Sequence, residues 1–216
     1  MIYRIILILF LGLFAQTCMT ADCSDHDRTC SPMEQIFSVL SVPKGLYLFS
    51  TPTSYDGILS ILGAGNLDPS LQSICAGARV VAPIINTTCQ NVIPLVSTLA
   101  VSVNNTTSFY ADFPTTGVPV RGPSGIKVAA DFTNFLTVDL ETSLSAAGLG
   151  DISFWTYSDI TGNYASGTTC LDGTDNTSSS QGYTGISTSV TAGSWFGVSA
   201  PTCDQSFPIL CICYEP

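Results

Sequence analysis

Few residue types in this chain could carry out acid–base or nucleophilic chemistry. The 216 residues include a single histidine, His26, close to the N-terminus. A Ser-His or Cys-His dyad needs an imidazole beside its nucleophile, and no histidine follows residue 26. Carboxylate pairs such as Asp139/Glu141 or Asp172/Asp175 could in principle act on a glycosidic bond, but acidic residues in loops are usually solvated. The sequence therefore predicts a protein that is not an enzyme.

The nine cysteines are the other reactive residues. Removal of a leader through residue 21 leaves eight of them, namely Cys23, Cys30, Cys75, Cys89, Cys170, Cys203, Cys211 and Cys213. An even number in an exported chain indicates disulfides, although the connectivity stays open. Zinc is the alternative, and it is disfavoured because the Cys-x-Cys at 211 and 213 has no second matching pair. No metal site is expected.

The chain is acidic, with sixteen Asp and Glu against six Lys and Arg and a formal net charge of −10. Its basic residues are spread along the sequence. Nucleic acids and heparin-like polyanions are bound by concentrated Lys and Arg, which release counterions. Neither is therefore expected as a partner.

Residues 1–21 have the pattern of a signal peptide. Arg4 precedes an apolar run from residue 5 to residue 14, and small residues follow up to Ala21. The run is too short to cross a bilayer comfortably, and no membrane span is expected elsewhere. Lipidation at Cys18 is an alternative to cleavage near Ala21. Either route predicts a secreted or cell-surface protein.

After the leader, residues 22–43 are interpreted as an N-terminal extension with a local Cys23–Cys30 bridge, and residues 44–216 as one domain. Residues 45–51 predict a strand. Asp68 as N-cap and Pro69 at the first helical position predict a helix that turns Cys75 inward. After this helix we expect a strand or a helix at 80–103, a loop at 108–125 and a short helix within 126–144.

The last third of the chain is poor in helix formers and rich in β-branched residues, with cysteines at both edges. Such a composition predicts short strands and a long loop stapled by a disulfide. Trp155 and Trp195 are expected in the core. Tyr183, between Gly182 and Gly185, is the better candidate for an exposed contact.

An ordered set of short motifs resembles the exported bacterial domain family DUF1554 over residues 44–216. The set comprises Lys44 to Gly57, the helix reaching Cys75, Pro123-Ser124-Gly125, Phe154-Trp155-Thr156, Cys170, Trp195, Cys203 and the Cys211/Cys213 pair. That family has a C-type-lectin-like fold and occurs in the Legionella collagen-like adhesin and in Leptospira proteins. The resemblance implies an α+β fold with short antiparallel sheets, one or two helices and a long disulfide-closed loop.

The resemblance also implies disulfides. Carried over to this chain, the family pattern pairs Cys75 with Cys213 and Cys170 with Cys203, which leaves Cys89 for Cys211. Residues 211 and 213 lie on one face of a strand, so an exchange of their partners stays open.

Sugar-binding lectins of this fold hold calcium with a Glu-Pro-Asn or Gln-Pro-Asp triplet and a Trp-Asn-Asp triplet, because calcium takes several clustered oxygen ligands. None of these triplets occurs here. Asp172, Asp175, Asn176 and Asp204 could supply oxygens, but no cofactor is expected. The glycosaminoglycan binding associated with the adhesin does not suit an acidic chain.

The function expected from these features is surface recognition without catalysis. The loop region 171–202 is the expected binding face for a glycan or a host or cell-surface protein. Its candidate binding residues are Tyr164, Asp172, Asp175, Asn176 and Tyr183. The alternative is a structural or oligomerisation module of a cell surface or matrix without a small ligand. The oligomeric state stays open.

Overall fold

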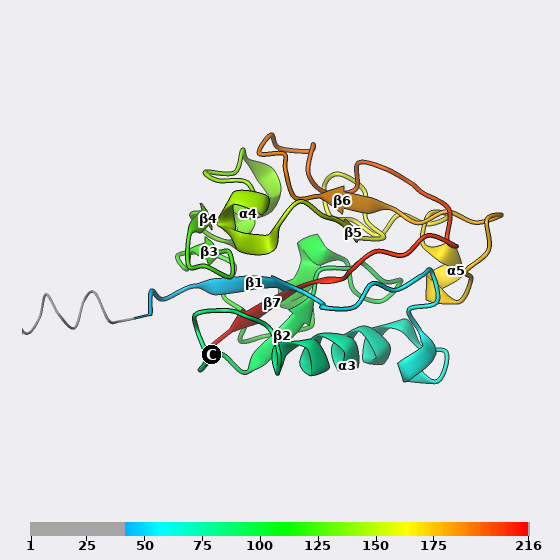
Figure 1. The fold of residues 1–216 in the computed structure, drawn as a ribbon, viewed down its shortest axis with the longest axis horizontal. Helices are drawn as coiled ribbons and strands as arrows, with labels where there is room; N and C mark the ends of the chain where they lie inside the picture. Colours follow the sequence, from blue (N-terminus) through cyan, green and yellow to red (C-terminus); the bar gives the residue numbers. More distant parts are fainter. Residues whose placement is uncertain (1–41, 216) are drawn as a thin grey trace, which may run out of the picture. The chain divides into compact units, whose positions relative to one another are not determined.

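The computed structural model describes residues 42–215. The expected signal peptide, the Cys23–Cys30 bridge and nearly all of the N-terminal extension lie outside these residues. The described chain is α+β, as predicted (Figure 1). Its elements in order are β1 (Leu46–Ser50), η2 (Ile61–Gly63), α3 (Leu67–Arg79), β2 (Asn91–Pro94), η3 (Val103–Ser108), β3 (Val120–Arg121), β4 (Lys127–Ala129), α4 (Phe132–Thr137), η4 (Ser145–Leu149), β5 (Ser153–Trp155), α5 (Cys170–Gly173), β6 (Thr184–Ile186) and β7 (Leu210–Tyr214).

The main sheet has five strands in the order β2-β7-β1-β3-β4, and a second sheet pairs β5 with β6. The expectation of purely antiparallel sheets is wrong at one place, because β1 and β3 are parallel. The 69 or so residues between them include α3, and a crossover of this length returns the chain to the starting edge of the sheet. The other strand pairs are antiparallel.

The strand β7 is the centre of the fold, since it pairs with β2 on one side and β1 on the other. All five of its residues are buried. Side chains alternate between the faces of a strand, so its two sets of residues enter two separate cores. Leu210 and Ile212 pack with Phe135 and Phe154, whereas the two cysteines pack against α3.

The helix α3 covers one face of this sheet (Figure 1). Leu71, Ile74 and Cys75 are buried on its inner side, as the spacing predicts. The predicted start is wrong by two residues: the helix begins at Leu67, so Asp68 is its second residue. The Asp68 carboxylate accepts a hydrogen bond from the Thr98 hydroxyl at 2.6 Å, which ties the helix start to the loop after β2.

Three disulfides connect the described residues. Cys170 is bonded to Cys203, as expected. The other two expected pairs are wrong, because the structure has Cys75–Cys211 and Cys89–Cys213 instead. The register explains the exchange. Cys89 leads into β2, whose first residue pairs with the end of β7, so the Cys89 thiol meets the last cysteine of that strand.

The middle and last thirds differ from the sequence predictions mainly in detail. Residues 126–144 hold the strand β4 followed by the short helix α4, so the predicted short helix is present within this range. The Asp131 side chain caps α4 by accepting a hydrogen bond from the Asn134 amide. Trp155 and Trp195 are both buried in the core, as predicted. The Trp155 indole donates a hydrogen bond of 2.8 Å to the carbonyl of Tyr55, which joins the second sheet to the segment after β1.

Candidate functional site

The segment between Cys170 and Cys203 is paired along much of its backbone rather than open. Isolated bridges join Thr169 to Gly182, Gln181 to Thr202 and Thr184 to Ser199. Together with the Cys170–Cys203 bond, they join residues 181–184, near the middle of the segment, to residues near both of its ends. Its exposed polar side chains are therefore carried on a backbone that these bridges and the disulfide hold together.

The segment opens with a left-handed turn, which makes up α5. Three residues in a row that are not glycine have positive φ, namely Cys170 at 50°, Leu171 at 49° and Asp172 at 54°, and Gly173 follows at 70°. Each such residue costs on the order of 1 kcal/mol or more. The disulfide, the Thr169 side chain that accepts from the Asp172 amide and the bond from the Thr174 amide to the Cys170 carbonyl hold the turn. The side chain of Leu171 is 65% exposed as a result.

Two of the predicted binding residues contact each other at this turn. The Tyr164 hydroxyl donates a hydrogen bond to Oδ1 of Asp172, and both residues are half-buried. Burial raises the pKa of Tyr164, and the bond to the carboxylate raises it further. The hydroxyl of Tyr164 is therefore already engaged by a partner within the fold.

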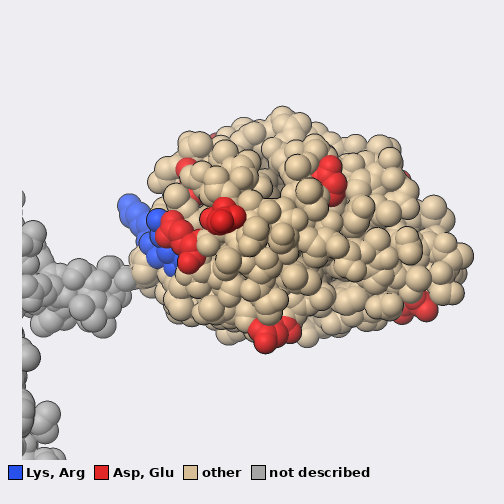
Figure 2. All heavy atoms as spheres, turned by 90° about the horizontal axis from the view of Figure 1, so that it is seen from above, with Lys and Arg blue, Asp and Glu red and all other residues tan. Residues whose placement is uncertain are grey.

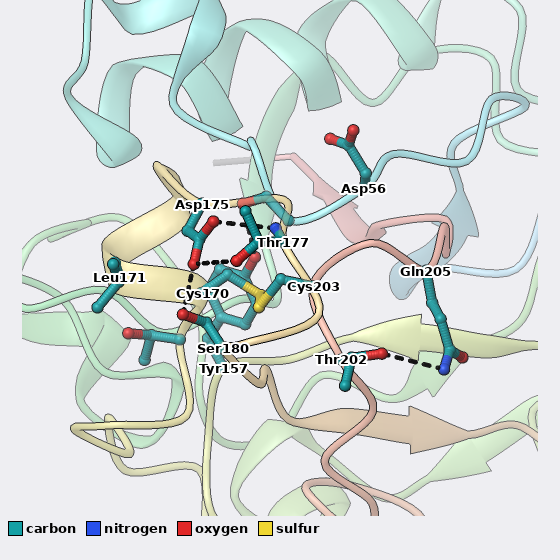
Figure 3. The surroundings of a disulfide bond; sticks show 12 residues. Asp56, Tyr157, Cys170, Leu171, Asp175, Thr177, Ser180, Thr202, Cys203 and Gln205 are labelled. Atoms are coloured by element: carbon teal, nitrogen blue, oxygen red, sulfur yellow. Dashed lines mark hydrogen bonds between the residues drawn. A yellow bond between two sulfur atoms is a disulfide. The ribbon is translucent and has the colours of Figure 1, made fainter.

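Asp175 organises the exposed part of the loop (Figure 3). Its carboxylate accepts hydrogen bonds from the Ser180 hydroxyl and from both the amide and the hydroxyl of Thr177. These bonds, that of Ser180 foremost, lower the pKa of Asp175. The neighbouring Asn176 donates to Oδ2 of Asp56 at 3.0 Å and so joins the loop to the chain after β1. The side chains of Asp175 and Asn176 are therefore both already hydrogen-bonded within the fold.

Gly57 is the point where that chain segment passes under the loop. A Cβ atom at Gly57 would lie 2.2 Å from the carbonyl oxygen of Asp175, 2.7 Å from Cβ of Cys203 and 2.8 Å from Sγ of Cys170. Only glycine allows so close an approach. The disulfide therefore rests directly on the backbone of the segment after β1.

Tyr183 stands apart from the other predicted residues. It is half-buried, and its backbone carbonyl accepts from the amides of Thr156 and Tyr157. Its side chain makes no hydrogen bond with any residue between 42 and 215. The structure thus brings Tyr164 into contact with Asp172. Asp175 and Asn176 are neighbours in the exposed loop. Tyr183 contributes hydrogen bonds through its backbone alone among residues 42–215.

A hollow of about 470 Å³ adjoins the left-handed turn. It lies between the start of α3, the loop after β2 and the turn itself, and its lining includes Asp68, Thr98, Leu99 and Asp172. Leu99 is 78% exposed. Sequence reasoning missed Leu99 and Leu171, because an isolated leucine in an apolar chain carries no signal of exposure. The positive φ of Leu171 has no signal in the sequence either.

On the face that Figure 2 shows, the acidic side chains are mostly spaced apart, and basic and acidic side chains lie side by side at one end. The structure brings together two bases that the sequence separates, since Nε of Arg121 donates to the Lys44 carbonyl at 2.9 Å. Lys127, which pairs with Arg121 across β3 and β4, forms an ion pair of 2.7 Å with Glu141.

Metal binding and membrane insertion find no support within residues 42–215. No three His, Cys, Asp or Glu side chains among them gather closely enough to hold a metal ion. No helix in the same range is long and apolar enough to cross a bilayer. What the site offers chemically is hydrogen bonding and apolar contact.

Comparison with known proteins adds no relative, because neither a family model nor a curated protein matches the chain.

Proposed function

We propose that this protein is an exported or cell-surface recognition module of C-type-lectin-like architecture. It binds its ligand through the loop region 171–202 and does not act as an enzyme. Three disulfides favour an oxidising compartment outside the cytosol, where such bonds persist. The lectin-like fold rests on the motif resemblance, together with an α+β architecture and a disulfide-closed loop.

The left-handed turn at 170–173 is the observation that carries this proposal. Strained backbone persists where the surrounding structure over-determines it, and it clusters at binding sites. Here a disulfide and two hydrogen bonds hold the strain, and the result is an exposed Leu171 beside a hollow. Glycine at the exposed position 171 would relieve this strain, so a fold under no functional demand gains nothing from a leucine there.

The chemistry of the face favours an uncharged glycan over an acidic one. Its exposed polar side chains between residues 174 and 181 are hydroxyls and amides, namely Thr174, Asn176, Thr177, Ser178, Ser179 and Gln181. The carboxylates of Asp68 and Asp172 in the adjoining hollow can accept hydrogen bonds from sugar hydroxyls, whereas they repel sulfate and carboxylate groups. Leu171 supplies the apolar contact that the carbon face of a sugar or a protein side chain requires.

The test is a binding screen of the mature chain against a glycan array and against cell-surface protein fractions. We expect a neutral ligand whose affinity falls at least tenfold in Leu171→Ala and in Asn176→Ala. Val138→Ala, which alters an exposed apolar side chain at the end of α4, is the matched control and should bind normally. Absence of any ligand, or equal binding by all three variants, would contradict the proposal.

The second candidate is a structural or oligomerisation module of a surface or matrix. The uncharged outer face of α3 is the observation that favours it. Both roles can belong to one protein, because that face and the 171–202 loop consist of different residues.

A further inference from the structure

The outer side of α3 carries no charged side chain among its exposed residues; Asp68 is half-buried and lies instead in the hollow beside the loop after β2. The exposed residues of this side are Asn66, Pro69, Ser73, Ala76 and Gly77. Surface helices usually place charged and polar residues on the side opposite the core. The guanidinium of Arg79 is directed instead onto the carbonyls of Asn86, Thr87 and Cys89.

Apolar side chains flank this face at both ends of the helix. Ile61 and Leu62 precede the helix and are 68% and 62% exposed, and Val80 and Val81 follow it and are 83% and 65% exposed. Scattered apolar residues on a surface are normal, but a group around one uncharged helix face marks an interaction site.

A hollow of about 250 Å³ runs along the same face. One wall is the segment after β1. The other is the helix, whose lining residues recur at intervals of three and four residues. The lining residues are Pro52, Thr53, Tyr55, Leu62, Ser73, Ile74, Gly77, Ala78 and Val81, and none is charged. A Cβ atom at Gly77 would meet nothing within 4 Å, so there is room over the helix backbone.

The face cannot hide its apolar residues by rotating the helix. Cys75 is bonded to Cys211 in the central strand, and Leu71 and Ile74 are buried under the helix. The orientation of α3 is therefore fixed, and the exposed side is presented in one geometry before any partner arrives.

From these features we infer that the outer face of α3 is a self-association surface, occupied by the same face of a second copy of this chain. The formal net charge of −10 makes two copies repel each other wherever their carboxylates meet. The α3 face avoids that repulsion because it holds no charge. Leu62 and Val81 line the hollow at opposite ends of the helix, so a two-fold axis across α3 places Leu62 of one copy against Val81 of the other and closes the two hollows on each other.

The dimer is weak and forms at high local concentration. A helix of thirteen residues is about 20 Å long, and a face of that length lies at the small end of specific protein interfaces. We expect a dissociation constant of about 10–100 µM.

Sedimentation velocity on the mature chain from about 10 µM to 1 mM tests the inference over the range that such a constant requires. We expect the weight-average sedimentation coefficient to rise with concentration. Val81→Asp and Leu62→Asp place two carboxylates at the two-fold interface and should weaken association at least tenfold. Leu99→Asp, at an equally exposed leucine beside the other hollow, should leave it unchanged.

A chain that stays monomeric up to the highest concentration overturns the inference, as does association that survives Val81→Asp or that is lost equally in Leu99→Asp. If the wild-type monomer binds lipid vesicles through Val81, another occupant is identified and self-association is wrong. Glycan binding measured on Val81→Asp separates the two proposals, because the 171–202 loop is intact in that variant.

Discussion

Cys75 of α3 is bonded to Cys211 of β7, with 5.9 Å between their Cα atoms, while the next cysteine of the strand takes a different partner. The two bonds span 136 and 124 residues, and each joins a cysteine in or shortly after α3 to a cysteine of β7. Once one of them has formed, the other closes only a short ring, because its ends are 14 residues apart on one side (89 − 75) and 2 on the other (213 − 211).

This near-redundancy predicts strongly non-additive effects of disulfide removal. Loop-closure entropy gives about 3 kcal/mol for a ring of roughly 16 residues and about 5 kcal/mol for one exceeding 100 residues. Cys75→Ala/Cys211→Ala and Cys89→Ala/Cys213→Ala should therefore each lower the free energy of unfolding by about 3 kcal/mol, and the quadruple variant by about 8 kcal/mol. Urea unfolding measures all three. Simple additivity would contradict the near-redundancy, whereas a loss of about 8 kcal/mol in either double variant would contradict the pairing, because each variant would then break both bonds.

Gly57 and Gly77 form a matched pair of glycines. Gly57→Ala brings a Cβ atom to within 3 Å of three atoms around the Cys170–Cys203 bond, and we expect a loss of stability of about 2–4 kcal/mol. Gly77→Ala meets empty space in a helix and should stabilise the protein by about 0.5–1 kcal/mol. Thermal unfolding at low protein concentration compares them; a neutral Gly57→Ala would disprove the close contact.

Leu171→Gly should separate stability from function. Glycine adopts positive φ without strain, so the variant should gain up to about 1 kcal/mol in the free energy of unfolding. It also removes the exposed side chain, so ligand binding should be lost. Calorimetry and a binding assay on the same sample measure both effects. A destabilised Leu171→Gly would mean that the leucine side chain packs against the fold.

The Asp175 network predicts an acid-sensitive loop. Its carboxyl has a lowered pKa in the folded protein, so the unfolded chain takes up its proton first as the pH falls. The stabilisation is complete well above the ordinary pKa of about 3.9 and is lost as the pH falls through the lower folded value.

NMR titration of the Thr177 amide, which donates to Oδ1 of Asp175, reports this transition. We expect its chemical shift to change with a midpoint below 3.9, and the change to be absent in Asp175→Asn. A midpoint above the ordinary carboxyl pKa would show that the hydrogen bonds do not favour the charged form.

The sequence predicts those parts of the fold that depend on local pattern and composition. Periodic apolar residues locate α3, a run of β-branched and aromatic residues locates β1, and burial of Trp155 follows from its size and apolar surroundings. The Cys170–Cys203 pair was available only through a resemblance that also implied the wrong partners for Cys75 and Cys89.

What the sequence could not predict depends on tertiary register. The partners of Cys211 and Cys213 follow from how β2 pairs with β7, and a two-residue difference leaves both on the same strand face. The positive φ of Leu171 arises from contacts distant in sequence, so local propensity gives no sign of it. Asp172 and Asp175 were predicted as binding residues because they are polar loop residues, and their internal partners became visible only in three dimensions.

The position of β7 sets the order in which this domain can be made. This interior strand comes after every other described strand in the sequence, and β2 and β1 have no common neighbour until residues 210–214 have emerged. The thiols of Cys75 and Cys89 must wait for more than 120 further residues before their proper partners exist. The Cys75–Cys211 and Cys89–Cys213 bonds can therefore form only after the chain has been made as far as β7, so the fold around them closes late.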